Sequence, residues 1–256
     1  MMADEPESLD GQRVLVTGAS GGIGASIVER LAVEGARPLI HYGKDKAAAE
    51  ALLARISGRG IILQADLSHS EGPFELWRKA EEAVGRIHAL INNAGIRTEI
   101  SIDADPAAWK AAWQREFQVN FFAAADLCKE ALRHFKANGG GRIISMASRA
   151  GQRGYAADAM PYGATKAALV NLTKSIARSF GRDGVVAIAV APGWVRTGMA
   201  EDFVAQYGKQ AVVADIPIGE MAEPTEVAEL VAFLLRPSQS SLNGATLDVN
   251  GGSYIR

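Results

Sequence analysis

Short apolar runs alternate with longer stretches of helical pattern along this chain, and this alternation constrains the fold more than any other feature. Several runs are almost continuously apolar, which is typical of parallel strands covered by helices on both faces. Alternating strands and helices form right-handed units that build a doubly wound sheet. Strands are expected at 13–17, 39–42, 61–64, 89–92, 142–145, 185–190 and 246–249. Helices are expected at 23–34, 44–56, 71–84, 106–136, 160–180 and 224–235. The predicted fold is a single-domain, doubly wound parallel α/β sheet of Rossmann type.

The chain length leaves the number of domains open, and the pattern decides it. A chain of 256 residues fits one large α/β domain or two small ones, and we find neither an internal repeat nor an interdomain linker. One domain is therefore expected over residues 11–256, after an acidic tail at residues 1–10 that we expect to be disordered. The tail lacks the basic and then apolar order of a signal peptide. The longest clean apolar run, 185–191, is too short to span a bilayer.

Charge and cysteine content narrow the range of partners. The net charge of −2 and the isoelectric point of about 6.1 give no basic field for nucleic acid or an anionic membrane. The single cysteine, Cys128, can form neither an intrachain disulfide nor a cysteine metal cluster. We therefore expect a cytoplasmic protein without a metal site, whose partner is a small molecule rather than nucleic acid or a membrane.

A glycine-rich turn at residues 17–24 lies between the first expected strand and the first expected helix. Its glycines at 18, 22 and 24 differ from the standard dinucleotide fingerprint, but the strand before and the helix after provide the right context. Missing side chains let the backbone approach a pyrophosphate, and the helix start directs free N–H groups and a positive dipole end at that anion. An ordinary glycine-rich turn is the alternative. The candidate cofactor residues here are Gly18, Ser20, Gly21, Gly22, Ile23 and Gly24.

The end of the second expected strand indicates which nicotinamide cofactor is used. An acidic residue about 20 positions after the glycines normally holds the ribose 2′-hydroxyl of NAD. Here Tyr42 stands at the strand tip, followed by Gly43 and Lys44, and Asp45 comes only afterwards. Lys44 could meet the 2′-phosphate of NADP, which favours NADP over NAD, unless it merely starts a solvated helix. His41 is expected to be an ordinary strand side chain.

Tyr162 and Lys166 are four residues apart in an expected helix, so they share one helix face. A tyrosine normally titrates near pH 10, and we expect the nearby ammonium to lower the pKa of Tyr162. Such a tyrosine can donate a proton to a carbonyl oxygen or accept one from an alcohol. Ser148 can hydrogen-bond the same oxygen, with Ser145 as a competing serine. The alternative is a surface pair with no chemistry.

These motifs occur together with others in a fixed order. Asp66-Leu67 follows the third expected strand, Asn92-Asn93-Ala94-Gly95 follows the fourth, and Asn120 lies in the long helix after it. Ser148, Tyr162 and Lys166 follow the fifth strand, and Pro192-Gly193-Trp194-Val195-Arg196-Thr197 follows the sixth. From about Leu9 to Gly252, this ordered set resembles the short-chain dehydrogenase/reductase family.

The resemblance implies roles for individual residues. Asn120, Ser148, Tyr162 and Lys166 would be the catalytic set, with Asn120 holding a water that relays protons and Lys166 also binding the nicotinamide ribose. The further cofactor residues that it implies are Asp66, Leu67, Asn93, Ala94, Gly95, Pro192, Gly193, Val195 and Thr197. The separation of Ser148 from Tyr162 looks one residue longer than the common spacing, which we place in the loop 152–159.

The sequence says less about the substrate. Candidate pocket residues after strand ends are Arg97, Arg149, Arg153, Tyr155, Trp194 and the segment 198–222, which is either a substrate lid or a surface crossover. Solvated loop arginines are the alternative for the basic residues. The chain is similar to 3-oxoacyl-(acyl-carrier-protein) reductases, and that activity is expected. Alternatives are a sugar, polyol or other small-alcohol dehydrogenase, and a catalytically idle NADP-binding regulator. The resemblance also implies a homo-oligomer, often a tetramer, formed through the long fourth and fifth helices and the C-terminal region.

Overall fold

The computed structural model describes residues 7–256 and contains one sheet in the strand order β3-β2-β1-β4-β5-β6-β7. Each neighbouring pair of strands is parallel. The strands are β1 (Arg13–Val16), β2 (Arg37–Tyr42), β3 (Ile61–Gln64), β4 (Ala89–Asn92), β5 (Gly141–Met146), β6 (Val185–Pro192) and β7 (Thr246–Val249). This architecture confirms the predicted doubly wound fold.

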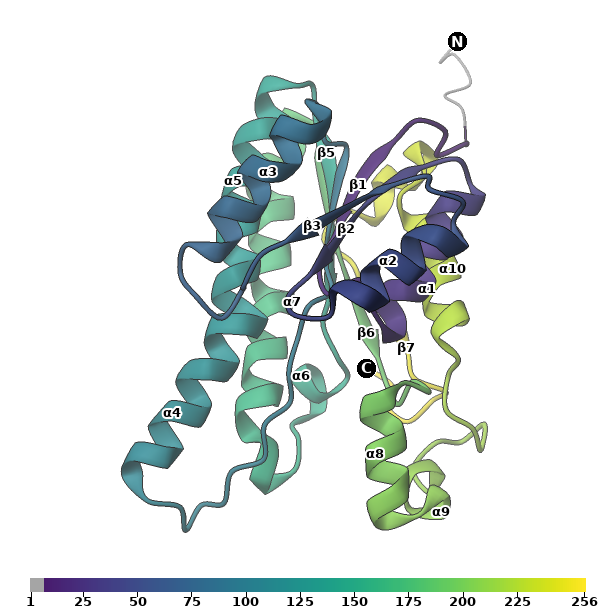
Figure 1. The fold of residues 1–256 in the computed structure, drawn as a ribbon. Helices are drawn as coiled ribbons and strands as arrows, with labels where there is room; N and C mark the ends of the chain where they lie inside the picture. Colours follow the sequence, from purple (N-terminus) through teal and green to yellow (C-terminus); the bar gives the residue numbers. More distant parts are fainter. Residues whose placement is uncertain (1–6) are drawn as a thin grey trace.

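Helices cover both faces of the sheet (Figure 1). On one face lie α1 (Gly22–Val33), α2 (Lys46–Arg55) and α10 (Pro224–Leu234), and their apolar residues share a core with the β1 and β6 side chains. On the other face lie α3 (Gly72–Val84), α5 (Ala123–Ala137) and α7 (Met160–Phe180). Among residues 7–256, no helix is both long and apolar enough to cross a membrane.

The chain leaves β1 toward one edge of the sheet and returns to β4 on the other side of β1. Loops after β1 and β4 therefore diverge, and a crevice opens between them at the carboxyl ends of the strands. The glycine turn follows β1, Asn93 follows β4 and Ser148 follows β5. The topology thus gathers the motifs of the sequence at one edge of the sheet.

The expected helix 106–136 is interrupted. It consists of α4 (Pro106–Phe117), a π-helical turn at Gln118–Phe122 and α5. A π turn widens the helix by one residue and often occurs at functional sites. Asn120 lies in this turn and is 1% exposed.

The remaining described helices are short. They are α6 (Ala150–Arg153), α8 (Gly198–Tyr207), α9 (Lys209–Val213), and the 3₁₀ turns Ala157–Ala159, Gly181–Asp183 and Pro237–Leu242. The segment 198–222, expected to be irregular, therefore contains two helices, and these lie at the carboxyl end of β6 (Figure 1). Ala200, Val212, Ile216 and Met221 form a small apolar cluster within this segment.

The tail that was expected to be disordered, residues 1–10, extends further than the structure allows. Residues 1–6 lie outside the described range, but the side chain of Leu9 is completely buried in the core beside α1. The backbone N–H of Gly11 donates to the Gly35 carbonyl, which ties this stretch to the turn after α1. The ordered chain therefore begins before residue 11.

Candidate active site

A cavity of about 570 Å³ opens at the carboxyl ends of β1, β4, β5 and β6. The residues expected at the cofactor that line it are Gly18, Gly21, Gly22, Ile23, Gly43, Lys44, Asp66, Leu67, Asn93, Ala94, Gly95, Tyr162, Lys166, Pro192, Gly193, Val195 and Thr197. Ser148 and the expected substrate residues Arg97, Arg149, Tyr155 and Trp194 line the same cavity. Ser20, Gly24, Tyr42, Asn120 and Arg153 are not among its lining residues.

The glycine turn is compact because its glycines approach other backbone closely. A Cβ atom on Gly24 would lie 2.5 Å from the Gly18 carbonyl oxygen and 2.6 Å from Asn93 Nδ2. Asn93 Nδ2 donates to the carbonyls of Thr17 and Gly18, which fastens the turn after β1 to the loop after β4. Gly24 therefore serves packing rather than lining the cavity.

The start of α1 fits a bound pyrophosphate. Gly22 has φ +55°, a backbone conformation that residues other than glycine rarely adopt, and Gly21 caps the helix without a side-chain hydrogen bond. Both glycines line the cavity, so the free N–H groups of the first helical turn have no side chain between them and an anion. The glycine turn, Asn93 to Gly95 and Pro192 to Thr197 would together hold a nicotinamide dinucleotide.

His41 has a role that the sequence did not indicate. The backbone N–H of Gly18 donates to His41 Nδ1 at 3.0 Å, and His41 Nε2 donates to the Ala65 carbonyl at 3.2 Å. The ring is 3% exposed, and burial lowers the pKa of His41 to about 4. A neutral imidazole therefore joins the glycine turn to the end of β3. A polar residue within the apolar run at 39–42 was the signal for it.

The lowered pKa of His41 predicts acid sensitivity. An unfolded histidine titrates near pH 6.5, so neutral His41 stabilises the fold above that pH, and this contribution is lost as the pH falls toward 4. Its full size is about 3 kcal/mol. Urea unfolding at a series of pH values should show the stability advantage over a His41→Gln variant shrinking across this window. A difference that does not change with pH would contradict this interpretation.

Tyr42 does not line the cavity, contrary to expectation. Its side chain is 8% exposed and packs in the apolar core on the α1 and α2 face. Gly43 and Lys44 line the cavity instead, one and two positions further on. The strand ends at Tyr42 as expected, but successive side chains of a strand point to opposite faces, and the Tyr42 side chain points into the core rather than into the cavity.

Asn120 fixes the loop after β4. Its Nδ2 donates to the Ile96 carbonyl at 2.9 Å and to Thr165 Oγ1 at 3.2 Å, while the Ile96 N–H donates to its Oδ1 at 2.7 Å. The amide thus uses both its hydrogens within the protein. Its geometry is that of a residue that positions the loop from Gly95 to Arg97.

Ser148, Tyr162 and Lys166 meet at one side of the cavity. Lys166 is 4% exposed, donates to the Met146 carbonyl at 2.8 Å, and lies 5.6 Å from the centre of the Tyr162 ring. Ser145 is the wrong serine for this site, because its hydroxyl accepts a hydrogen bond from Thr173 within the core. The serine, tyrosine and lysine selected from the sequence are therefore brought together.

The expected lowering of the tyrosine pKa is wrong for the ligand-free protein. Burial raises the pKa of Tyr162 to about 12, against a hydrogen bond with Ser148 that lowers it. Burial also lowers the pKa of Lys166 to about 8, so its ammonium is weakened as a source of positive field. Tyr162 is therefore a protonated phenol at neutral pH, ready to donate.

Aromatic rings and an arginine form the end of the cavity beyond Tyr162. The Tyr155 ring lies 5.6 Å from the Tyr162 ring, and the Arg97 guanidinium lies 5.6 Å from the centre of the Tyr155 ring and 5.8 Å from that of Phe203. Trp194 packs 4.9 Å from Phe203. This end of the cavity therefore presents apolar rings beside a cation.

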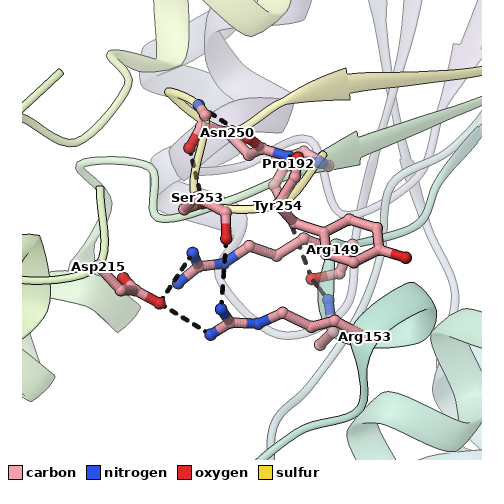
Figure 2. Close-up of polar contacts among 10 residues, drawn as sticks. Arg149, Arg153, Pro192, Asp215, Asn250, Ser253 and Tyr254 are labelled. Atoms are coloured by element: carbon pink, nitrogen blue, oxygen red, sulfur yellow. Dashed lines mark hydrogen bonds and ion pairs between the residues drawn. The ribbon is translucent and has the colours of Figure 1, made fainter. Parts of the chain in front are cut away.

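The segment 198–222 is tied to the loop that carries Ser148 (Figure 2). Arg149 is 4% exposed, and its Nη1 lies 3.2 Å from Asp215 Oδ2, while Arg153 Nη2 lies 2.9 Å from the same oxygen. Arg153 also donates to the Ser253 carbonyl, so the C-terminal turn joins the same group of contacts. We call Arg149, Arg153 and Asp215 the Asp215 bridge. Sequence reasoning named both arginines but could not identify their partner.

The geometry of this site defines a class of protein. A doubly wound sheet with a dinucleotide cavity and a serine, a tyrosine and a lysine beside it is typical of oxidoreductases that act on CH–OH groups with a nicotinamide cofactor. A family model described as enoyl-(acyl carrier protein) reductase matches residues 18–254. The chain belongs to the short-chain dehydrogenase/reductase family, and it is an oxidoreductase.

Individual relatives agree with this assignment over nearly the whole chain. The 3-oxoacyl-(acyl-carrier-protein) reductase of Vibrio cholerae is 33% identical over 97% of this chain and 99% of its own. The cis-4-hydroxycyclohexanecarboxylate dehydrogenase of Sinomonas cyclohexanicum is 35% identical over 93% of this chain and 94% of its own. A crystal structure of a dehydrogenase/reductase from Sinorhizobium meliloti 1021 superposes with a TM-score of 0.85 at 32% identity, covering 97% of both chains.

Proposed function

We propose that this protein is an NADPH-dependent reductase of 3-oxoacyl thioesters. The observation that supports this most is that Ser148, Tyr162 and Lys166 line one cavity with the glycine turn. The names of relatives from Vibrio cholerae and Synechocystis, both 3-oxoacyl-(acyl-carrier-protein) reductases, favour the thioester substrate. The bound nicotinamide supplies the hydride.

Each residue then has a distinct part in the reaction. Tyr162, held protonated by burial, donates its proton to the oxygen of the substrate carbonyl. Ser148 hydrogen-bonds the same oxygen and orients it, and Lys166 holds the nicotinamide ribose beside Tyr162. Asn120 keeps the loop after β4 in place through Ile96. Trp194, Tyr155 and Arg97 contact the rest of the substrate.

The test is turnover with a defined set of probes. Purified protein is mixed with NADPH and acetoacetyl-coenzyme A, and the loss of absorbance of NADPH is followed. The same assay with simple ketoses tests the sugar and polyol alternative. An idle NADP-binding regulator would bind NADPH but consume it with none of these carbonyl compounds.

A second candidate function is the reduction of a carbonyl compound that carries a carboxylate. The charges of the cavity favour such a substrate. Apart from Asp66 at the end of β3, the charged residues that line it are cations: Lys44, Arg97, Arg115, Arg149 and Lys166. Three of these cations are arginines, a residue type that binds carboxylates in a bidentate geometry, although Arg97 also pairs with Glu99 and Arg149 with Asp215. The relative from Sinomonas cyclohexanicum is named for a hydroxy acid of this kind. 4-Oxocyclohexanecarboxylate therefore belongs in the probe set.

The proposed preference for NADPH rests on Gly43 and Lys44. A Cβ atom on Gly43 would have open space, with its closest contact 4.0 Å away at the Ala65 carbonyl. Gly43→Asp should therefore place a carboxylate where the 2′-phosphate of NADPH would lie. We expect the ratio of kcat/KM for NADPH to that for NADH to fall by more than about tenfold. The matched control is Tyr42→Phe in the core, which should leave the ratio unchanged.

The Asp215 bridge should affect substrate binding more than chemistry. Asp215→Asn leaves the buried Arg149 without its carboxylate and loosens the first turn of α8, which lines the cavity. We expect KM for the carbonyl substrate to rise about tenfold with a smaller change in kcat. Asp183→Asn, which removes a surface ion pair with Lys136, is the control. Equal steady-state constants for the two variants would show that the bridge does not position this segment.

We also propose that the chain forms a single cytoplasmic domain, which begins before the expected residue 11, and that it assembles as a homotetramer. The support is a row of contacting rings along α4 and the π turn: Trp109, Trp113, Phe117 and Phe122. Phe122 is 49% exposed, so this row of rings presents apolar surface that a second subunit would cover. Sedimentation equilibrium measures the oligomeric state.

A further inference from the structure

Glu116 is a completely buried acid in the last turn of α4, next to the proposed active site. Its exposed fraction is 0%. The backbone N–H of Thr98 donates to its Oε2 at 2.9 Å, and Asn120 Nδ2 lies 3.4 Å from its Oε1. Burying a carboxylate is costly unless hydrogen bonds and an opposite charge compensate it. Hydrogen bonds from Thr98 supply the first of these, so the question is where the opposite charge lies.

Lys166 is the buried cation on the other side of Asn120. A Cβ atom on Gly95 would lie 3.3 Å from Lys166 Nζ and 3.4 Å from Asn120 Oδ1, so the ammonium and the amide face the same point. Asn120 Nδ2 also donates to Thr165, the residue before Lys166 in α7. One amide therefore separates the buried carboxyl from the buried amine.

The ionisable groups that act on Glu116 belong to two neighbouring elements. Lys166 and Tyr162 face it from α7, and Arg97, which is paired with Glu99, faces it from the loop after β4. Burial raises the pKa of Glu116, while the Thr98 hydrogen bond and then the charges of Lys166 and Arg97 lower it. Burial lowers the pKa of Lys166, and the charge of Glu116 raises it. Acid and amine thus favour each other's charged form.

We propose that Glu116 is a positioning residue for the reaction, because its carboxylate is the buried counter-charge that keeps Lys166 an ammonium beside Tyr162. It touches neither substrate nor cofactor and acts through Lys166. The proposal rests on the proposed function for its catalytic meaning, since Lys166 matters only if this cavity performs the reduction. The charge relation itself belongs to the folded protein alone.

Glu116→Gln separates charge from shape. Glutamine keeps the side-chain length and an oxygen that can accept the Thr98 N–H, but it carries no charge. Without the carboxylate, burial acts on Lys166 unopposed, so the ammonium should deprotonate at lower pH. Loss of a nearby opposite charge lowers the pKa of a lysine, so we expect the Lys166 midpoint to fall by about one pH unit.

The measurement is an NMR titration of the cofactor-free protein with labelled lysine side chains. The signal that disappears in a Lys166→Met variant identifies Lys166. We expect a midpoint near pH 8 in the unmodified protein, a lower one in Glu116→Gln, and an intermediate one in Glu116→Asp, which keeps the charge on a shorter side chain. In turnover assays, the alkaline loss of kcat should move to lower pH by the same amount.

A folded Glu116→Gln protein with an unchanged Lys166 midpoint would overturn the proposal. If that variant does not fold, the effect of Lys166 on Glu116 tests the proposal instead. Lys166→Met must raise the pH midpoint of the Glu116 carboxyl group, followed by the NMR signal of its carboxyl carbon. An unchanged midpoint would refute the coupling. Absence of turnover with every carbonyl probe would instead contradict the proposed function. It would leave the titration result standing, so the two failures are distinguishable.

Discussion

Tyr162→Phe should lower kcat by about a thousand-fold while the affinity for NADPH stays nearly the same. Phenylalanine keeps the ring that packs 5.6 Å from Tyr155, but it removes the phenolic proton. In the unmodified protein that proton is present throughout the neutral range, because burial raises the pKa of Tyr162 to about 12. Ser148 hydrogen-bonds the substrate oxygen, but in the proposed mechanism only Tyr162 transfers a proton to it. Steady-state NADPH consumption and a fluorescence titration of NADPH binding measure the two quantities.

The matched control makes the same chemical change outside the cavity. Tyr254→Phe removes a phenol near the C-terminus, where the Tyr254 carbonyl accepts a hydrogen bond from Asn250 (Figure 2). This variant should keep the unmodified rate. A Tyr162→Phe enzyme that also keeps a near-normal rate would remove Tyr162 from the mechanism.

Gly22→Val should weaken NADPH binding by more than about a hundred-fold. Gly22 opens α1 at the cavity with φ +55°, and a Cβ atom there would already lie 3.4 Å from Thr197 Cγ2. The two further methyl groups of valine would therefore occupy the space in which the pyrophosphate meets the helix start. The expected loss is measured by fluorescence titration with NADPH.

Backbone strain has to be separated from this loss of affinity. Gly58 has φ +72° with nothing within 4 Å of a built Cβ atom, so Gly58→Val carries comparable strain far from the glycine turn. Both variants should melt at similar, slightly lowered temperatures, and Gly22→Val alone should lose NADPH. If Gly22→Val bound NADPH normally and melted like Gly58→Val, the cofactor would have to bind elsewhere.

The fold was predictable because each buried strand is a nearly continuous apolar run between helices. The runs at 61–64, 89–92 and 246–249 correspond to β3, β4 and β7 without any change of boundary. The ordered motifs were also predictable as one site, because parallel strands bring their carboxyl ends to the same edge. Local patterning fixes these features.

What could not be predicted depends on contacts between distant segments or on a shift of a single residue. Tyr42 does end β2, but its side chain points into the core, and the cavity is lined by the next residues, Gly43 and Lys44. Asp215 is the partner of Arg149 across 66 residues, and no local pattern indicates such a pairing. The sequence around Glu116 contains a weak indication that this acid is buried. It is four residues after buried Ala112 and four before buried Asn120, a spacing that places an acid on an inward face.

The most direct test of the central claim is the transfer of hydrogen from the nicotinamide to a carbonyl carbon. The protein is incubated with NADPH carrying deuterium at both C4 positions, together with acetoacetyl-coenzyme A and, separately, 4-oxocyclohexanecarboxylate. Mass spectrometry then locates the label. We predict one deuterium on the carbinol carbon of at least one product, and formation of that product about a thousand-fold more slowly by Tyr162→Phe. An alcohol formed without deuterium, or formed equally well by Tyr162→Phe, would contradict the proposed reaction.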